Sequence, residues 1–108
     1  MNTRQMAYII ELAQTENFNR AAENLYISQP TLTYQIKLVE GEIGFRIFDR
    51  SGRGATLTPA GEQFVTTLRN IMTELSMAIE QGQNFASQYG VEVEISIEIN
   101  ARSEKGFD

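Results

Sequence analysis

The chain contains no cysteine and no histidine among its 108 residues. The absence of cysteine excludes disulfide bonds and thiol nucleophiles. Without histidine the chain also lacks the commonest transition-metal ligand and the usual acid–base catalyst near neutral pH. No segment approaches the roughly 20 apolar residues of a membrane span, and the N-terminus lacks the basic and apolar regions of a signal peptide. We therefore expect a cytoplasmic protein that is not an enzyme, uses no cofactor and has no membrane partner.

Positive charge is also scarce, because nine lysine and arginine residues stand against fourteen acidic residues, and the net charge is −5. Affinity for DNA comes largely from basic side chains that meet phosphates, so this total argues against a nucleic-acid partner. The distribution of the charged residues along the chain removes this argument against a nucleic-acid partner. Residues 1–57 hold six basic and six acidic residues, whereas residues 91–108 hold two basic and five acidic residues. We expect the C-terminal tail to face away from any DNA.

Apolar residues at helical spacing predict a first helix over about Thr3–Gln14 and a short second helix that ends near Tyr26. Asn19 is a good N-cap for the second helix. Ala21 and Ala22 lie on its inner face, where small side chains let a following helix cross closely. The pattern fits a helix-turn-helix, although two alanines on a core face are common in any helical protein.

Ser28 and Pro30 mark the start of a third helix, because serine caps helix N-termini and proline is tolerated in the first turn. Gly44 supplies the left-handed residue that commonly ends a helix. The inner face carries an apolar stripe, which consists of Leu32, Ile36, Val39 and Ile43. The outer face keeps polar, aromatic and basic side chains, namely Gln29, Thr31, Thr33, Tyr34 and Lys37.

Each side-chain type on this outer face has a use in a DNA major groove. Glutamine can pair with an adenine edge, threonine can touch a thymine methyl group or a phosphate, and tyrosine and lysine can reach the backbone. For any one of these residues taken alone, a solvated polar face is the better explanation. Taken together, the outer-face residues favour DNA binding, because a second segment suited to contact DNA follows them in the sequence.

This second element is a β-hairpin predicted by two short runs, residues 46–48 and 55–57, on either side of Ser51-Gly52-Arg53-Gly54. The glycines permit the turn. Arg53 between two glycines can approach the DNA backbone or a narrow minor groove, and Arg50 is the expected phosphate partner. The hairpin is therefore a candidate wing beside the third helix.

Thr58-Pro59 predicts the start of a fourth helix that has no obvious stop before Gly90. Its apolar residues alternate steps of four and three, as in a coiled-coil seam, and comprise Phe64, Leu68, Ile71, Leu75, Ala78, Gly82, Phe85 and Tyr89. Some thirty residues extend over roughly 45 Å, which is longer than a domain this small covers with its own surface. We expect a homodimer through this helix. The alternative is a long helix packed along its own globule.

Residues 91–99 alternate apolar and mostly acidic side chains, which predicts a strand with one apolar face. Residues 100–108 offer no partner for it. We expect this orphan strand to begin a truncated effector domain that is partly disordered.

The first ninety or so positions also contain a specific set of residues, which are Phe18, Arg20-Ala21-Ala22, Leu25, Ser28-Gln29-Pro30, Gln35-Ile36, Glu40, Glu42-Ile43-Gly44, Phe48, Arg50, Gly52-Arg53, Leu57-Thr58 and Ala60-Gly61. With this set the region resembles the N-terminal part of LysR-type transcriptional regulators. The resemblance implies a winged helix-turn-helix, a linker helix that pairs two subunits, and a C-terminal effector domain that binds a small-molecule inducer. It also implies groove contacts from Gln29, Pro30, Thr31, Thr33 and Tyr34, and wing contacts from Arg50 and Arg53. The chain departs from the family at Tyr34 and Leu38, which replace usual basic residues.

The predicted fold is mainly α. A winged helix-turn-helix with a small β-hairpin wing spans residues 1–58, a dimerisation helix spans residues 59–90, and the orphan strand with its tail spans residues 91–108. The predicted function is sequence-specific binding of a dyad-symmetric DNA operator by a homodimer on the bacterial nucleoid, with an inducer only in a full-length form. The alternative is a protein-interaction module with weak or lost DNA binding. An enzyme is disfavoured because its best carboxylate pair, Glu40 and Glu42, points apart on a helix and fits a solvated face.

Overall fold

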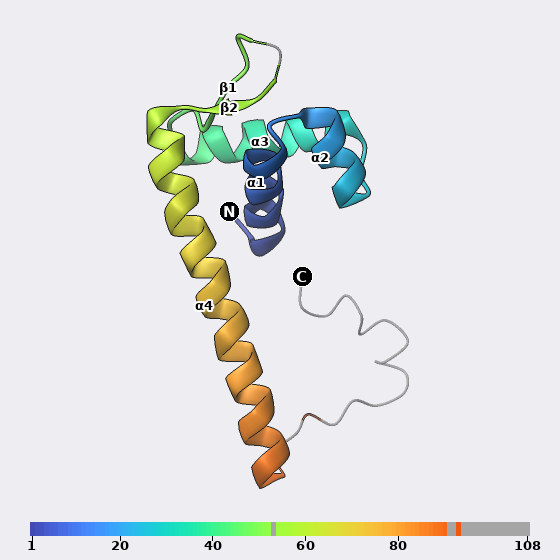
Figure 1. Ribbon diagram of the computed structural model, residues 1–108, viewed down its shortest axis with the longest axis vertical. Helices are drawn as coiled ribbons and strands as arrows, with labels where there is room; N and C mark the ends of the chain where they lie inside the picture. Colours follow the sequence, from blue (N-terminus) through green and yellow to red (C-terminus); the bar gives the residue numbers. More distant parts are fainter. Residues whose placement is uncertain (53, 91–92, 94–108) are drawn as a thin grey trace. The chain divides into compact units, whose positions relative to one another are not determined.

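The computed structural model describes residues 1–52, 54–90 and 93 of the chain. Its elements follow in the order α1 (Thr3–Thr15), α2 (Phe18–Leu25), α3 (Gln29–Ile43), β1 (Phe48–Asp49), β2 (Thr56–Leu57) and α4 (Pro59–Tyr89) (Figure 1). This order confirms the mainly helical, winged helix-turn-helix fold. The chain divides into two units, residues 1–71 and residues 72–108, so α4 begins in the first and ends in the second. Apart from Val93, the predicted strand and tail over residues 91–108 lie outside the described residues.

Helix α2 begins earlier than the sequence indicated, so the predicted N-cap at Asn19 is wrong. The N-cap is Asn17, whose side chain accepts the backbone N–H of Arg20 at 2.9 Å. Glu16, the residue that follows α1 as its C-cap, adopts a left-handed conformation with φ 57°. The chain therefore reverses within two residues, and Phe18 and Asn19 already belong to α2.

The turn between α2 and α3 is tight. Tyr26 takes the left-handed conformation with φ 60°, and the backbone N–H of Ile27 donates to the carbonyl of Ala22 at 3.0 Å. The side chain of Ser28 then caps α3, as predicted, by accepting the N–H of Thr31 at 3.2 Å. These local interactions set the direction in which α3 leaves the turn.

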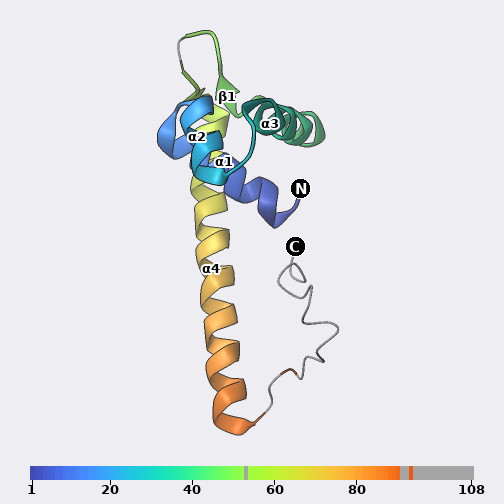
Figure 2. The same ribbon diagram turned by 90° about the vertical axis from the view of Figure 1, so that its right-hand side faces the viewer.

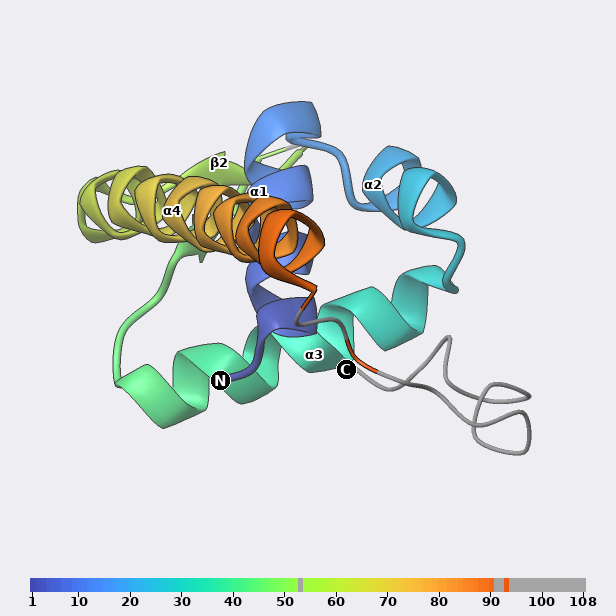
Figure 3. The ribbon, with the colours of Figure 1, turned by 90° about the horizontal axis from the view of Figure 1, so that it is seen from below.

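The core of the first unit lies between the three short helices, the base of the hairpin and the start of α4. Its buried apolar residues are Ile9, Leu12, Ala13, Ala21, Ala22, Leu32, Ile36, Val39, Ile47, Phe48, Ala55, Val65 and Leu68. Helix α1 crosses α3 (Figure 3), and the side-chain amide of Gln5 donates to that of Gln35 at 2.8 Å across this crossing. The inner face predicted for α3 is confirmed, since Leu32, Ile36 and Val39 are all buried in this core.

The predicted hairpin is present, and it stands out from the three helices (Figure 2). Its antiparallel pairs are Phe48 with Leu57 and Asp49 with Thr56, so the strands begin later than the predicted runs. Its return arm is held against α1, because the N–H of Ala55 donates to the carbonyl of Glu16 at 3.0 Å. A Cβ on Gly54 would lie 2.5 Å from the same oxygen. Glycine is thus required at this position by the close approach of the two backbones.

Helix α4 is joined to the base of the hairpin by Thr58. Its hydroxyl donates to the carbonyl of Arg46 at 2.6 Å and accepts the N–H of Gly61 at 2.9 Å. Gly61 lies directly against the backbone of Ile47, and a Cβ there would be 2.9 Å from the carbonyl carbon of Ile47. The helix ends where the sequence predicted, before Gly90, which has φ 71°.

Candidate nucleic-acid interface

Helix α3 and the wing together line a shallow recess in the first unit. We call it the wing recess; its volume is about 490 Å³, and it is lined by Asn17, Phe18, Asn19, Gln29, Thr33, Lys37, Arg50, Gly52 and Gly54. Gln29, Thr33 and Lys37 follow one another at intervals of four, which places them along one side of α3. Among the described lining residues, both charged side chains are basic. The recess therefore combines hydrogen-bonding groups with positive charge on one surface.

Four of the eight residues predicted to contact DNA meet in this recess, namely Gln29, Thr33, Lys37 and Arg50. Pro30, Thr31 and Tyr34 are not in its lining, although all three are exposed on α3. Arg53 lies outside the described residues. Three further residues at the start of α2 line the recess without having been predicted to contact DNA, namely Asn17, Phe18 and Asn19.

The side chains at the start of α3 are already engaged with one another. The amide nitrogen of Gln29 donates to the hydroxyl of Thr33 at 2.6 Å, and the hydroxyl of Ser28 donates to that of Thr31 at 2.7 Å. The first of these bonds holds the Gln29 amide against α3. An orienting bond of this kind lowers the entropy lost when the side chain meets a ligand.

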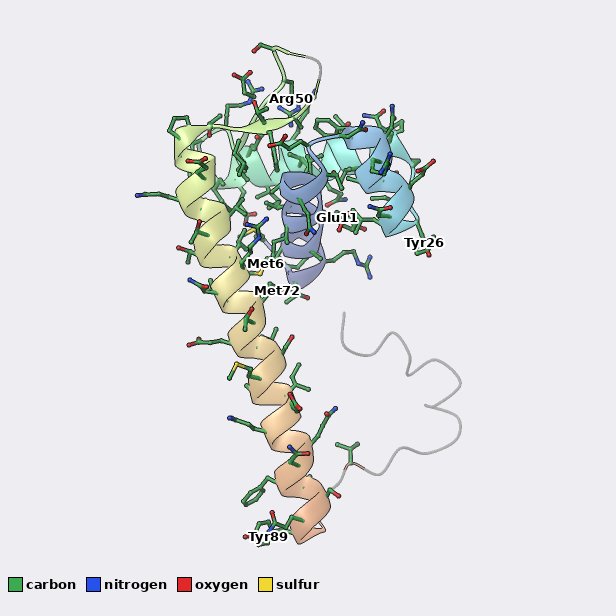
Figure 4. The ribbon with its side chains drawn as sticks, viewed as in Figure 1. Met6, Glu11, Tyr26, Arg50, Met72 and Tyr89 are labelled. Atoms are coloured by element: carbon green, nitrogen blue, oxygen red, sulfur yellow. The ribbon has the colours of Figure 1, made fainter. Side chains whose placement is uncertain are left out.

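Arg50 is held more firmly than a free phosphate-binding arginine. It lies at the base of the wing (Figure 4), and its guanidinium is 5.3 Å from the ring centroid of Phe18. One of its terminal nitrogens is 3.4 Å from a carboxylate oxygen of Glu40, and the side chain is only 22% exposed. Its Nε is buried without a hydrogen-bond partner. Only part of the guanidinium is therefore available to a ligand in the wing recess.

Glu40 is the residue that the sequence analysis interpreted wrongly. We expected it on a solvated face, but it is 7% exposed and accepts the backbone N–H groups of Ile47 at 2.7 Å and Phe48 at 3.1 Å. Arg46 adds a weaker ionic contact at 3.8 Å. Buried carboxylates are retained where they are paired and hydrogen-bonded. Glu40 thus fastens the start of the wing to α3.

Strand β1 of the wing contains one carboxyl group with a shifted pKa. The backbone N–H of Ser51 donates to Oδ1 of Asp49 at 2.9 Å, and this bond lowers the pKa of Asp49 below its ordinary value. Asp49 therefore stays ionised at neutral pH. The positive charge of Arg46 also lowers the pKa of Asp49.

The predicted dimerisation seam divides into two parts. Leu68 is 2% exposed and packs in the core of the first unit, so the structure places it apart from the exposed members of the predicted seam. Phe64 also packs within this unit, with its ring 5.5 Å from that of Phe45 in an edge-to-face arrangement. The seam residues that remain exposed are Ile71, Leu75, Ala78, Gly82, Phe85 and Tyr89. The first turns of α4 belong to the core, because Val65 and Leu68 are buried in it and Gly61 lies against the backbone of Ile47.

Two other kinds of site are absent from the part of the chain that the structure describes. It contains no cluster of acidic, histidine or cysteine residues able to hold a metal ion. Among the same residues, no helix combines the length and the apolar character needed to cross a membrane.

The model of the bacterial regulatory helix-turn-helix proteins of the lysR family matches residues 3–62. The chain belongs to the LysR family. It is accordingly a DNA-binding domain of a transcription regulator and not an enzyme.

Two curated LysR-type relatives show the extent of the similarity. The HTH-type transcriptional regulator YcgK of Bacillus subtilis (strain 168) is 35% identical over 97 residues, which cover 90% of this chain and 30% of YcgK. The DNA-binding transcriptional dual regulator OxyR of Escherichia coli (strain K12) is 37% identical over 90 residues, which cover 80% of this chain and 30% of OxyR. The chain thus spans about 30% of the length of these relatives.

Two solved LysR-type structures share the architecture. The BenM DNA-binding domain in complex with catB site 1 DNA aligns with a TM-score of 0.80 and 27% identity, covering 82% of this chain and 96% of that one. The CbnR DNA-binding domain in complex with DNA aligns with a TM-score of 0.76 and 34% identity, covering 80% of this chain and 99% of that one. Both of these domains were crystallised with DNA.

Proposed function

We propose that the chain binds double-stranded DNA sequence-specifically as a homodimer, with α3 in the major groove and the wing against the adjacent backbone. The observation that carries this proposal is the wing recess, where Gln29, Thr33 and Lys37 of α3 meet Arg50 of the wing. An α-helix fits the major groove, where base edges are exposed. The related BenM and CbnR domains, crystallised with DNA, support the same partner.

The residues of the recess divide into two roles in this proposal. Gln29 and Thr33 contact base edges, because an amide has a donor and an acceptor that match adenine, and a threonine methyl can meet a thymine methyl. Lys37 and Arg50 contact phosphates, which fix the position of the protein and carry no sequence information. Pro30, Thr31, Tyr34 and Arg53 complete the proposed contact surface.

Dimerisation is proposed through α4. Its exposed seam from Ile71 to Tyr89 includes Leu75 and Phe85, and apolar side chains of this size in a regular stripe gain free energy when a second helix covers them. A two-fold dimer presents two recognition helices, so its operator should have dyad symmetry with half-sites one or more helical turns apart. Residues 1–58 then form the DNA-binding domain and residues 59–90 the dimerisation helix.

Two further properties belong to the proposal and concern the full-length protein. A small-molecule inducer acts only on a full-length form, through the effector domain that the LysR family implies beyond the 30% of its relatives that this chain spans. A regulator bound to bacterial DNA works on the nucleoid, so the proposed location is the cytoplasm.

The deciding experiment is selection from a pool of random duplex DNA at two salt concentrations, using protein of measured oligomeric state. Enrichment of a dyad-symmetric motif is the expected result. Replacement of Gln29 or Thr33 by alanine should relax the enriched motif, whereas Arg53→Ala should weaken binding to all sequences.

The main competing function is a protein-interaction module, which the net charge of −5 and the exposed apolar side chains of α4 favour. It predicts dimers without measurable DNA affinity even at low salt. Salt-sensitive binding without an enriched motif would instead indicate a nonspecific DNA-binding protein, and both results would contradict the proposal.

A further inference from the structure

Helix α3 exposes two large apolar side chains on its outer face. Tyr34 is 59% exposed and Leu38 is 44% exposed, and they stand four residues apart on the same side of the helix. Each follows a buried core residue, Leu32 or Ile36, by two positions, and two positions correspond to a rotation of about 200°. Both side chains therefore point away from the core.

The same face stays open beyond Tyr34. Gly41 lies seven residues further along α3, and a Cβ at that position would meet nothing within 4 Å. No side chain at Gly41 keeps another molecule away from this part of the helix. Tyr34, Leu38 and Gly41 form a surface that we call the outer stripe.

The outer stripe adjoins the wing recess, because Thr33 and Lys37 immediately precede Tyr34 and Leu38 on α3. When DNA binds with a phosphate or a groove edge against Lys37, the neighbouring side chains of Tyr34 and Leu38 enter the same groove. Leucine cannot bind a phosphate oxygen. The apolar group that a major groove offers is the C5-methyl group of thymine.

We propose that Tyr34 and Leu38 are specificity-determining residues that contact thymine methyl groups in the operator half-site. This inference rests on the proposed function, since it assigns part of the same DNA surface. The ring of Tyr34 and the isobutyl group of Leu38 exclude water from the methyl groups. The preference for thymine at these positions comes from apolar burial, not from hydrogen bonding or charge.

The test uses the operator obtained by selection and replaces its thymines one at a time by deoxyuridine, which lacks only the methyl group. At the contacted positions the chain should bind about fourfold more weakly for each methyl group removed. The variants Tyr34→Ala and Leu38→Ala should bind the thymine and deoxyuridine operators equally well at the position that each residue contacts. Tyr34→Phe should keep the methyl effect, because the ring and not the hydroxyl makes the contact.

Tyr26→Ala is the matched control, because Tyr26 is also a strongly exposed tyrosine but lies at the end of α2 (Figure 4). It should keep the full methyl effect. Thermal unfolding of each variant separates loss of contact from loss of fold, and both outer-stripe positions are exposed enough to tolerate alanine.

Three results would overturn the inference. Operator binding that is insensitive to deoxyuridine at every position would remove it and leave the proposed function intact. A methyl effect that persists in both alanine variants would assign the contact to other residues. A change of oligomeric state in Leu38→Ala without a change in the methyl effect would assign the outer stripe to a protein contact. Failure to select any operator is a different outcome, since it would remove the proposed function as well.

Discussion

The buried carboxylate of Glu40 should be one of the most sensitive positions in the domain, and Glu40→Ala tests this directly. The substitution leaves the N–H groups of Ile47 and Phe48 without their acceptor. Each unsatisfied buried donor costs about 1–3 kcal/mol, and Arg50 loses its carboxylate partner as well. We expect a loss of about 3–5 kcal/mol in the free energy of unfolding, a large part of the stability of a small domain.

Glu42→Ala is the matched control, since it removes the same side chain two residues away on the same helix. The carboxylate of Glu42 is exposed and pairs with the amino group of Met1 at 3.0 Å. An exposed ion pair contributes about 0–1 kcal/mol. Glu40→Gln should fall between the two, because it keeps an acceptor oxygen for the backbone but removes the charge.

The assay is urea denaturation followed by far-UV circular dichroism, at one fixed protein concentration because the stability of a dimer depends on concentration. Thermal unfolding of the same variants gives a second measurement, in which a difference of 3 kcal/mol corresponds to a shift of at least about 12 °C in Tm for a domain of this size. If Glu40→Ala and Glu42→Ala differ by less than about 0.5 kcal/mol, the hydrogen bonds of Glu40 do not hold the wing, and our account of the wing is wrong.

Three further predictions concern α4 and the recess. Gly61→Ala should unfold the domain or lower the free energy of unfolding by several kcal/mol, because its Cβ would overlap a backbone carbonyl. The control Gly41→Ala should raise Tm slightly, because alanine has the higher helix propensity. Equal Tm values for the two variants would contradict this prediction. Leu68→Ala should lower the free energy of unfolding by about 2–5 kcal/mol, because Leu68 is buried in the core. Leu75→Ala should mainly raise the dimer dissociation constant measured by sedimentation equilibrium. If Leu75→Ala instead destabilises the fold and Leu68→Ala weakens the dimer, our division of the seam into buried and exposed parts is wrong. Lys37→Ala should weaken binding to every DNA sequence and reduce the slope of log K against log salt by about 0.9, and an unchanged slope would remove Lys37 from the phosphate contacts.

The elements that could be predicted are those with a local cause. Ser28 and Pro30 started α3, and Gly44 ended it, because capping and left-handed φ depend on a few neighbouring residues. The length of α4 followed in the same way from Thr58-Pro59 and Gly90. The side chains of Gln29, Thr33 and Lys37, which line the wing recess, could be selected as candidates because they share the face opposite a clear apolar stripe.

The features that could not be predicted depend on residues far apart in the chain. Asn17 and Asn19 are both good N-caps, and only the early turn at Glu16 decides between them. Glu40 carries no local signal of burial, because its partners are the backbone groups of the wing. The periodicity of α4 cannot distinguish Leu68, which the domain core covers, from Leu75, which the core leaves exposed.

For this LysR-type domain, the sequence by itself determined where α3 and α4 begin and end, which face of α3 is buried, and the chemical character of its exposed face. These properties arise from short-range backbone and side-chain preferences. Only the tertiary structure decided that Glu40 fastens the wing, that Arg50 is held by Glu40 and Phe18, and which part of α4 stays exposed. Those outcomes depend on contacts between segments that lie far apart in the chain, and the pattern of residues within a single helix does not specify such contacts.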